Sequence, residues 1–150
     1  VRMDEATREK ILPFIVRWAT YRAKQFTGDV LMGFYSQIMA MREATVAATH
    51  RYDFVISPVS PVPAFEAAYC CPGNDPENAL EHIAFTVPYN MSEQPAASIN
   101  WSYSTYRKTL GLPIGVQVAG RRFDDLGVLQ LCRFIEKIRP TQRPWPVRIS

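Results

Sequence analysis

The chain has 150 residues, of which 47% are hydrophobic and 21% are charged, a balance typical of one globular domain rather than of a disordered tail. No uncharged stretch approaches the roughly 18 residues that a membrane-spanning helix needs, so a membrane protein and a membrane partner are excluded as interpretations. The net charge of +3 comes with basic residues dispersed over the last third, which favours a solvated surface with internal ion pairs over a nucleic-acid patch.

The first fifty residues predict a helical region. Asp4 is the expected N-cap of a first helix, and Pro13 either kinks this helix or begins a second one. After Gly28, apolar residues at helical spacing predict a helix of about twenty residues, roughly 30 Å long, that ends at His50. We interpret its apolar stripe as core rather than as a cofactor site. The stripe comprises Val30, Leu31, Phe34, Ile38, Met41, Thr45 and Ala48.

The middle of the chain alternates short strands with proline-rich connections. Residues 52–57 predict a strand that Pro58 stops, and residues 57–63 are interpreted as a stiff loop rather than as a polyproline ligand. Asp75-Pro76-Glu77 predicts the start of a helix over residues 78–84. Residues 85–87 are expected to be extended up to Pro88, and residues 96–101 to form another strand.

The last third predicts a buried strand followed by an amphipathic helix. Residues 114–119 are almost wholly apolar, so we expect a strand covered on both faces. Residues 101–109 are expected to form an irregular loop or a hairpin that rests on the sheet, rather than an aromatic surface for single-stranded nucleic acid. Asp124 or Asp125 caps a final helix that Pro140 ends. One face of this helix carries Val128, Leu131, Cys132, Ile135 and Ile138.

Residues that could carry chemistry are sparse. His50 and His82 lie far apart in the sequence, and no motif for a metal, phosphate or nucleotide is present, so we expect no metal and no other cofactor. His82 is interpreted as a surface residue. Cys70 and Cys71 have no basic neighbour that would activate a thiolate, and reduced thiols are expected for them. Reduced cysteines, together with a charged first ten residues, lead us to expect a cytoplasmic protein.

Three stretches carry a family resemblance. The first runs Arg-Tyr-Asp-Phe-Val-Ile-Ser-Pro over residues 51–58, and the second includes Thr-Val-Pro-Tyr-Asn over residues 86–90. The third and most specific is Gly-Leu-Pro-Ile-Gly-Val-Gln over residues 111–117, followed by Gly-Arg-Arg-Phe-Asp over residues 120–124. Together they resemble the carboxyl-terminal part of the amidase signature family of serine hydrolases.

The resemblance implies an α/β fold, namely a partial mixed-sheet layer with flanking helices that forms the C-terminal portion of the amidase signature α/β/α fold. Residues 1–150 would then be a single incomplete domain, helical over 1–50 and family-like over 51–146. Such enzymes hydrolyse carbon–nitrogen bonds of carboxamides through a serine acyl-enzyme, with two serines and a lysine as catalytic residues. Neither their Lys-Gly-Ser element nor their glycine-rich double-serine loop occurs here, so we assign no catalytic residue and expect the chain alone to be inactive.

The resemblance also assigns pocket residues. The segment over residues 87–96 passes near the family's acyl-binding cavity, and we therefore expect a small-molecule amide substrate to contact the side chains of Tyr89, Asn90, Met91 and Gln94. A glycine of the commoner pattern is replaced by Glu93, which affects a tight turn. Ile83 stands where amidotransferase-type members carry an acid that holds glutamine, so hydrolysis of amides is expected rather than transamidation.

The expected partner is the amino-terminal amidase portion that carries the catalytic residues. Without it, part of the sheet would expose apolar surface and unpaired edges, and self-association into a homo-oligomer is expected. An alternative interpretation is a non-catalytic binding or assembly module that complements a separate N-terminal half.

Overall fold

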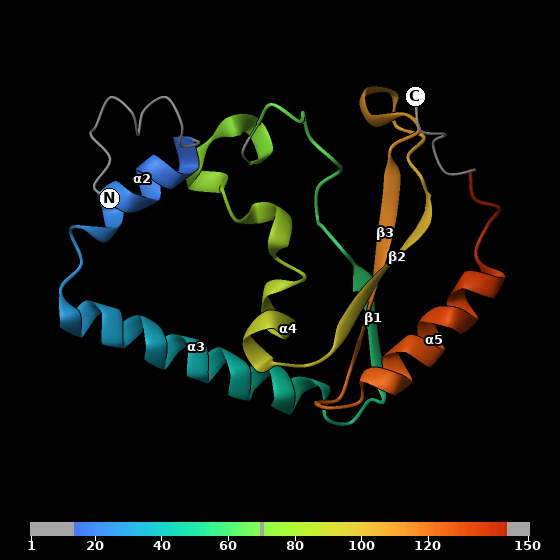
Figure 1. The fold of residues 1–150 in the computed structure, drawn as a ribbon, viewed down its shortest axis with the longest axis horizontal. Coiled ribbons are helices and arrows are strands. Elements are labelled where there is room, and N and C mark those ends of the chain that lie inside the picture. Colours follow the sequence, from blue (N-terminus) through green and yellow to red (C-terminus); the bar gives the residue numbers. More distant parts are fainter. Residues whose placement is uncertain (1–13, 70, 144–150) are drawn as a thin grey trace, which may run out of the picture.

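The computed structural model describes residues 14–69 and 71–143, which form a small sheet with helices on either side (Figure 1). The predicted Asp4 cap and Pro13 kink lie outside the described residues. The helices and strands are α2 (Phe14–Ala23), α3 (Gly28–Thr49), β1 (Phe54–Pro58), α4 (Val87–Ser92), β2 (Ala96–Tyr103), β3 (Pro113–Gly120) and α5 (Asp125–Ile138). Short 3-10 turns connect several of them. None of the described helices is long and apolar enough to cross a membrane.

Strand β3 lies at the centre of a three-stranded sheet with the order β1-β3-β2. Both of its neighbours run antiparallel to it, with Ile56 opposite Val118 on one side and Ala97 opposite Val118 on the other. The α/β class and the three predicted strands are confirmed. Pro58 takes part in β1, which a proline tolerates because this strand lies at an edge of the described sheet.

Helix α5 covers one face of the sheet and forms the core with it. The Asp124 side chain accepts a hydrogen bond from the Gly127 amide at 3.1 Å, which confirms the predicted N-cap. A Cβ atom at Gly120 would lie 2.7 Å from Val128 Cγ2, so a larger residue at the end of β3 would require the Val128 side chain to shift. Of the predicted apolar face, Ile138 is exposed. The buried core consists of Ile99, Val118, Val128, Cys132 and Ile135.

Helix α3 confirms the predicted span but not the predicted burial. Its carboxyl-terminal half packs on α4, where Arg42, Val46 and Thr49 are half-buried. At its end, His50 Nδ1 lies 2.6 Å from the Ala47 carbonyl oxygen, as expected for a residue that closes a helix. Residues 28–41, in contrast, are exposed throughout and extend away from the sheet (Figure 1).

The apolar stripe of α3 is therefore not core within the described part of the chain. The large side chains of the stripe are between 37% and 50% exposed, although the Phe34 ring packs edge-on against Phe26. We call this surface the exposed α3 face. It consists of Val30, Leu31, Met32, Phe34, Tyr35, Ile38, Met39 and Met41. An apolar surface of this kind on a long helix is typical of one that another part of a protein covers.

Two local predictions between the strands are wrong. The helix expected over residues 78–84 is replaced by two 3-10 turns, Pro76–Asn78 and Glu81–Ile83, although Asp75 still accepts a hydrogen bond from the Glu77 amide at 3.0 Å. The segment expected to be extended before Pro88 instead begins α4, with Pro88 in its first turn. A proline fits there because the first turn of a helix does not use that N–H group.

Candidate functional site

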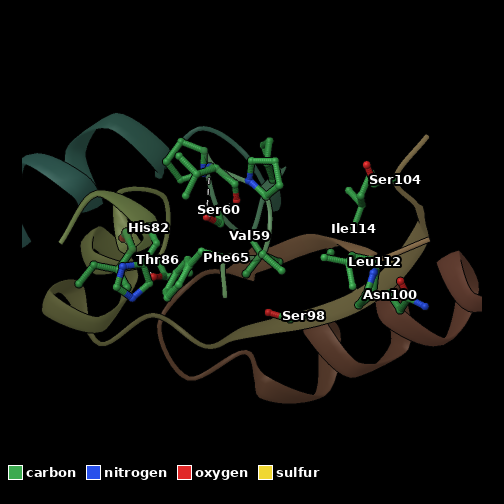
Figure 2. Close-up of a pocket in the computed structure, with 18 of the residues that line it drawn as sticks. Val59, Ser60, Phe65, His82, Thr86, Ser98, Asn100, Ser104, Leu112 and Ile114 are labelled. Atoms are coloured by element: carbon green, nitrogen blue, oxygen red, sulfur yellow. Dashed lines mark hydrogen bonds between the residues drawn. The ribbon is translucent and has the colours of Figure 1, made fainter. Parts of the chain in front are cut away.

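A cavity of about 670 Å³ lies between the loop that follows β1, the turn Glu81–Ile83 and the sheet. Figure 2 shows side chains from all three regions directed toward a common space. The loop over residues 58–65 forms one wall, and residues from β2 and the start of β3 form the opposite one. Its main contributors are Val59, Ser60, Phe65, His82, Ile83, Thr86, Ser98, Asn100, Ser104, Leu112, Ile114 and Gly115.

The proline-rich loop that follows β1 is held against the sheet. The Val59 amide donates to the Gly115 carbonyl at 3.2 Å, which continues the strand pairing past β1. A Cβ atom at Gly115 would lie 2.7 Å from Val59 Cγ2, so glycine is what lets the loop lie this close. Ser60 Oγ donates to the Val62 carbonyl at 2.8 Å and closes a turn within the loop. These contacts set the shape of the cavity wall.

A buried glutamine connects the sheet to the segment that precedes α4. Gln117 is 3% exposed, and its Nε2 donates to Ser57 Oγ at 3.1 Å and to the Phe85 carbonyl at 3.0 Å. The first bond reaches β1 and the second reaches the segment that leads into α4. Gln117 therefore ties that segment to the centre of the sheet, and with it the turn that carries His82.

His82, which the sequence analysis interpreted as a surface residue, lies in the wall of the cavity. It is half-buried in the cavity wall, where its ring packs edge-on against Phe65 with centroids 5.6 Å apart. Its Nδ1 atom is buried and has no hydrogen-bond partner among residues 14–69 and 71–143. The same is true of Asn100 Oδ1 in the sheet wall. No local pattern could have placed His82 there, since Phe65 is distant in the sequence.

The four predicted substrate-binding residues lie together on α4 and the turn after it. Tyr89 is buried, and burial raises the pKa of its phenol; Asn90 is exposed, and Met91 is half-buried. Gln94 uses its amide internally, because Nε2 donates to the Gly120 carbonyl at 2.8 Å and Oε1 accepts from Ser92 Oγ at 2.9 Å. None of the four belongs to the described cavity lining, and their contact with substrate stays a prediction.

Glu93 ends α4 in the left-handed conformation, with φ 57° and ψ 30°. Glycine adopts this backbone geometry without strain, which explains why the commoner family pattern has a glycine where this chain has Glu93. The Glu93 carboxylate contacts two arginines. Arg42 of α3 lies at 3.1 Å and 3.0 Å from its two oxygens, and Arg122 after β3 contacts the second oxygen. The two ion pairs connect α3, α4 and the end of β3.

We expect Glu93→Gly to be more stable than Glu93→Ala by about 1 kcal/mol, because both lose the ion pairs but only glycine removes the strain. Urea unfolding of the two variants measures the difference. Glu43, an exposed residue in the interior of α3, provides the control. There the order reverses, since Glu43→Gly is expected to be about 1 kcal/mol less stable than Glu43→Ala. Equal stability of the two Glu93 variants would contradict the assignment of strain.

Metal binding has no support in the described ranges, where no group of three His, Cys, Asp or Glu side chains could hold an ion.

The family of the chain is shown by residues 2–129, which match the protein-family model for Amidase. The chain belongs to the amidase family. This confirms the resemblance on which the sequence analysis depended.

Individual amidase relatives match this chain over a small part of their own length. A glutamyl-tRNA(Gln) amidotransferase subunit of Thermotoga maritima is 39% identical over 90 residues, which are 60% of this chain and 17% of that protein. The corresponding subunit of Pseudothermotoga lettingae is 37% identical over 89 residues, 59% of this chain and 17% of that protein. The matched region is the carboxyl-terminal part of these relatives.

Solved amidase structures extend the match to nearly the whole chain. The Thermotoga maritima amidotransferase subunit superimposes with a TM-score of 0.64 at 27% identity, covering 92% of this chain and 30% of that one. A structure of 6-aminohexanoate cyclic dimer hydrolase complexed with substrate gives a TM-score of 0.68 at 26% identity, covering 91% and 30%. The chain thus corresponds to less than a third of the length of these amidases.

Proposed function

We propose that this chain supplies the scaffold and one wall of the substrate cavity in an amidase-type hydrolase that cleaves carboxamides through a serine acyl-enzyme. The observation that carries the proposal is the match of nearly the whole chain to 30% of an amidase with bound substrate. The chain contains no Lys-Gly-Ser element and no glycine-rich double-serine loop, so the nucleophile and its base come from another part of the polypeptide. The cytoplasm is the location we propose.

We propose further that the remaining amidase fold covers the exposed α3 face. Residues 28–41 are exposed along their whole length in the described part of the chain, although their side chains are largely apolar. Covering them removes apolar surface from water, at about 25 cal/mol for each Å². In the absence of that partner, the same surface favours association between copies of this chain. In the assembled enzyme, α4 and its following turn, with Tyr89, Asn90, Met91 and Gln94, border the amide substrate.

The test compares the 150-residue chain with the same chain joined to, or co-expressed with, the amino-terminal amidase part. Release of ammonia from simple carboxamides is measured in each case. We expect no turnover by the chain alone and turnover by the assembled protein, abolished by a serine-directed reagent. Activity of the isolated chain that the reagent abolishes would overturn the proposal. Stable association with the amino-terminal part but no turnover of any amide would favour the alternative of a non-catalytic assembly module.

A further inference from the structure

We propose that Asn100 selects amides whose far end carries a neutral hydroxyl or N–H group, and that Gln142 is the positioning residue that orients the Asn100 side chain toward this group. The inference rests on the proposed amidase function and adds a determinant of substrate choice. It starts from a polar atom in the cavity wall. Asn100 Oδ1 is buried and has no hydrogen-bond partner in the part of the chain that the structure describes.

An irregularity in β2 accompanies the position of Asn100 in the cavity wall. The register of β2 against β3 shifts directly after Asn100, so Trp101 has no partner on β3. The neighbours of Asn100 serve the other face of the sheet, where Ile99 is buried in the core and Trp101 packs against it. Asn100 itself belongs to the cavity lining. Bulges of this kind often direct a side chain into a functional site.

Gln142, in the segment after α5, fixes which way the Asn100 amide points. Gln142 Oε1 accepts a hydrogen bond from Asn100 Nδ2 at 2.8 Å. Gln142 Nε2 donates to the carbonyls of Trp101 at 3.1 Å and Pro140 at 2.6 Å. Because both carbonyls need a donor, Gln142 presents its nitrogen to them and its oxygen to Asn100. Asn100 Nδ2 is thereby engaged, and Asn100 Oδ1 is the atom left for a ligand.

Two arginines hold the segment after α5 against the sheet. Arg139 Nη1 donates to the Asn100 carbonyl at 2.8 Å, and Arg143 Nη1 donates to the Gly111 carbonyl at 2.9 Å. The Arg143 guanidinium also lies over the Tyr103 ring, 4.3 Å from its centroid. The orientation of the Asn100 amide is therefore set by contacts that exist before a ligand binds, and such preorganisation favours selective recognition.

The chemistry of the lining defines the group that Asn100 would bind. An amide oxygen accepts hydrogen bonds but cannot donate them, so the ligand must supply the donor. The described lining contains no Asp, Glu, Lys or Arg side chain, and a buried ammonium would lack a counter-charge. His82 Nδ1 is also buried without a partner, at the opposite end of the lining in Figure 2. Its imidazole nitrogen donates or accepts according to the tautomer, so Asn100 is what specifies a donor.

The first experiment uses the intact amidase that contains this chain and two matched pairs of amides. The pairs are 6-hydroxyhexanamide with heptanamide and 5-hydroxypentanamide with hexanamide, in which a methyl group replaces the hydroxyl. Two lengths are used because the proposed nucleophile belongs to another part of the polypeptide. We expect kcat/KM for the hydroxyl amide to be about tenfold higher in at least one pair. An apolar wall without an acceptor would favour the methyl group instead.

The outcomes separate the inference from the proposed function. Turnover with no preference for the hydroxyl in either pair, or with a preference for the methyl group, overturns the inference while the amidase function stands. Turnover of none of the four amides overturns the amidase function and the inference with it.

The second experiment removes the acceptor. Asn100→Leu keeps a side chain of similar shape without an oxygen, and we expect it to reverse the preference in favour of the methyl amide. Asn100→Ala, which adds no bulk, repeats the test if the leucine variant fails to fold. Continued turnover of the methyl amide shows that each variant is folded. An unchanged ratio of the two kcat/KM values would rule out Asn100 as the selecting residue.

The third experiment tests the positioning role of Gln142. Gln142→Ala leaves Asn100 Nδ2 without its acceptor, and we expect the preference for the hydroxyl to fall about threefold or more, with little change for the methyl amide. Gln142→Glu keeps an acceptor for Asn100 Nδ2 and should retain the preference. Gln130→Ala, at an exposed position of α5, is the control and should change neither kcat/KM value by more than about twofold. An equal loss for both amides in Gln142→Ala would assign Gln142 to structure alone.

Discussion

Replacing Leu31 and Phe34 by glutamate is expected to keep the isolated chain monomeric but to destabilise the assembled amidase. Both side chains belong to the exposed α3 face, at 50% and 39% exposure. In the isolated chain the double variant Leu31→Glu/Phe34→Glu removes apolar surface, so self-association should fall. In the assembled protein the same carboxylates would be buried against the remaining amidase fold, and the loss of apolar contact alone costs about 3 to 5 kcal/mol for a large side chain.

Light scattering of the isolated chain and ammonia release by the assembled enzyme measure the two effects. We expect the variant chain to be closer to a monomer, and the variant enzyme to lose most of its activity or to fail to assemble. Gln37→Glu, which adds a carboxylate to an exposed polar position of the same helix, is the control and should change neither readout. If the double variant assembled with full activity, α3 would not be the covered face.

The elements that the sequence predicted correctly are those encoded by local patterns. Strand β3 is a nearly uninterrupted apolar run between Pro113 and Gly120, and its central position in the sheet agrees with that composition. Helix α5 begins with a capping aspartate and repeats apolar residues at helical spacing, and both signals lie within one segment. The left-handed conformation of Glu93 was not predicted, because the replacement of the family's glycine left the geometry of this turn open.

The errors arose where a local rule competed with another one. Pro88 was expected to keep its predecessor extended, but proline is equally suited to the first turn of a helix, and α4 forms. The Asp75 carboxylate does accept a hydrogen bond from the Glu77 amide, yet the chain completes only the 3-10 turn Pro76–Asn78 before the second turn, Glu81–Ile83, begins. The apolar stripe of α3 was interpreted as core because helical spacing indicates a face that is covered, and it cannot indicate which polypeptide covers it.

The cavity itself could not be predicted from the sequence. Its walls come from residues 58–65, 82–86, 98–104 and 112–115, which meet only after β1 and β2 have paired with β3. The ring contact between His82 and Phe65 joins two residues that are distant in the sequence and forms only in the folded chain. The predicted site residues on α4 came from resemblance instead, and the described geometry places Gln94 in the scaffold between α4 and the end of β3.

We expect Gln117→Glu to destabilise the protein by roughly 3 kcal/mol or more at neutral pH. The amide of Gln117 donates to both Ser57 Oγ and the Phe85 carbonyl, whereas a carboxylate can donate to neither. The Phe85 carbonyl would then face a buried negative charge, and the segment leading into α4 would lose its bond to the sheet. Gln130→Glu, an exposed change on α5, is the matched control and should change stability by less than about 0.5 kcal/mol.

The pH dependence separates this explanation from a mere packing defect. Burial without a donor raises the pKa of the introduced carboxyl above its unfolded value of about 4.3, so the folded variant favours the protonated form. The loss of unfolding free energy relative to the unmodified protein should therefore be largest near pH ~7.5. It should shrink as the pH falls toward ~4.5, where the protonated carboxyl donates to one of the two acceptors. Urea unfolding at both pH values measures it. A deficit independent of pH would assign Gln117 to packing alone, and the Phe85 bond would not be what holds the cavity wall in place.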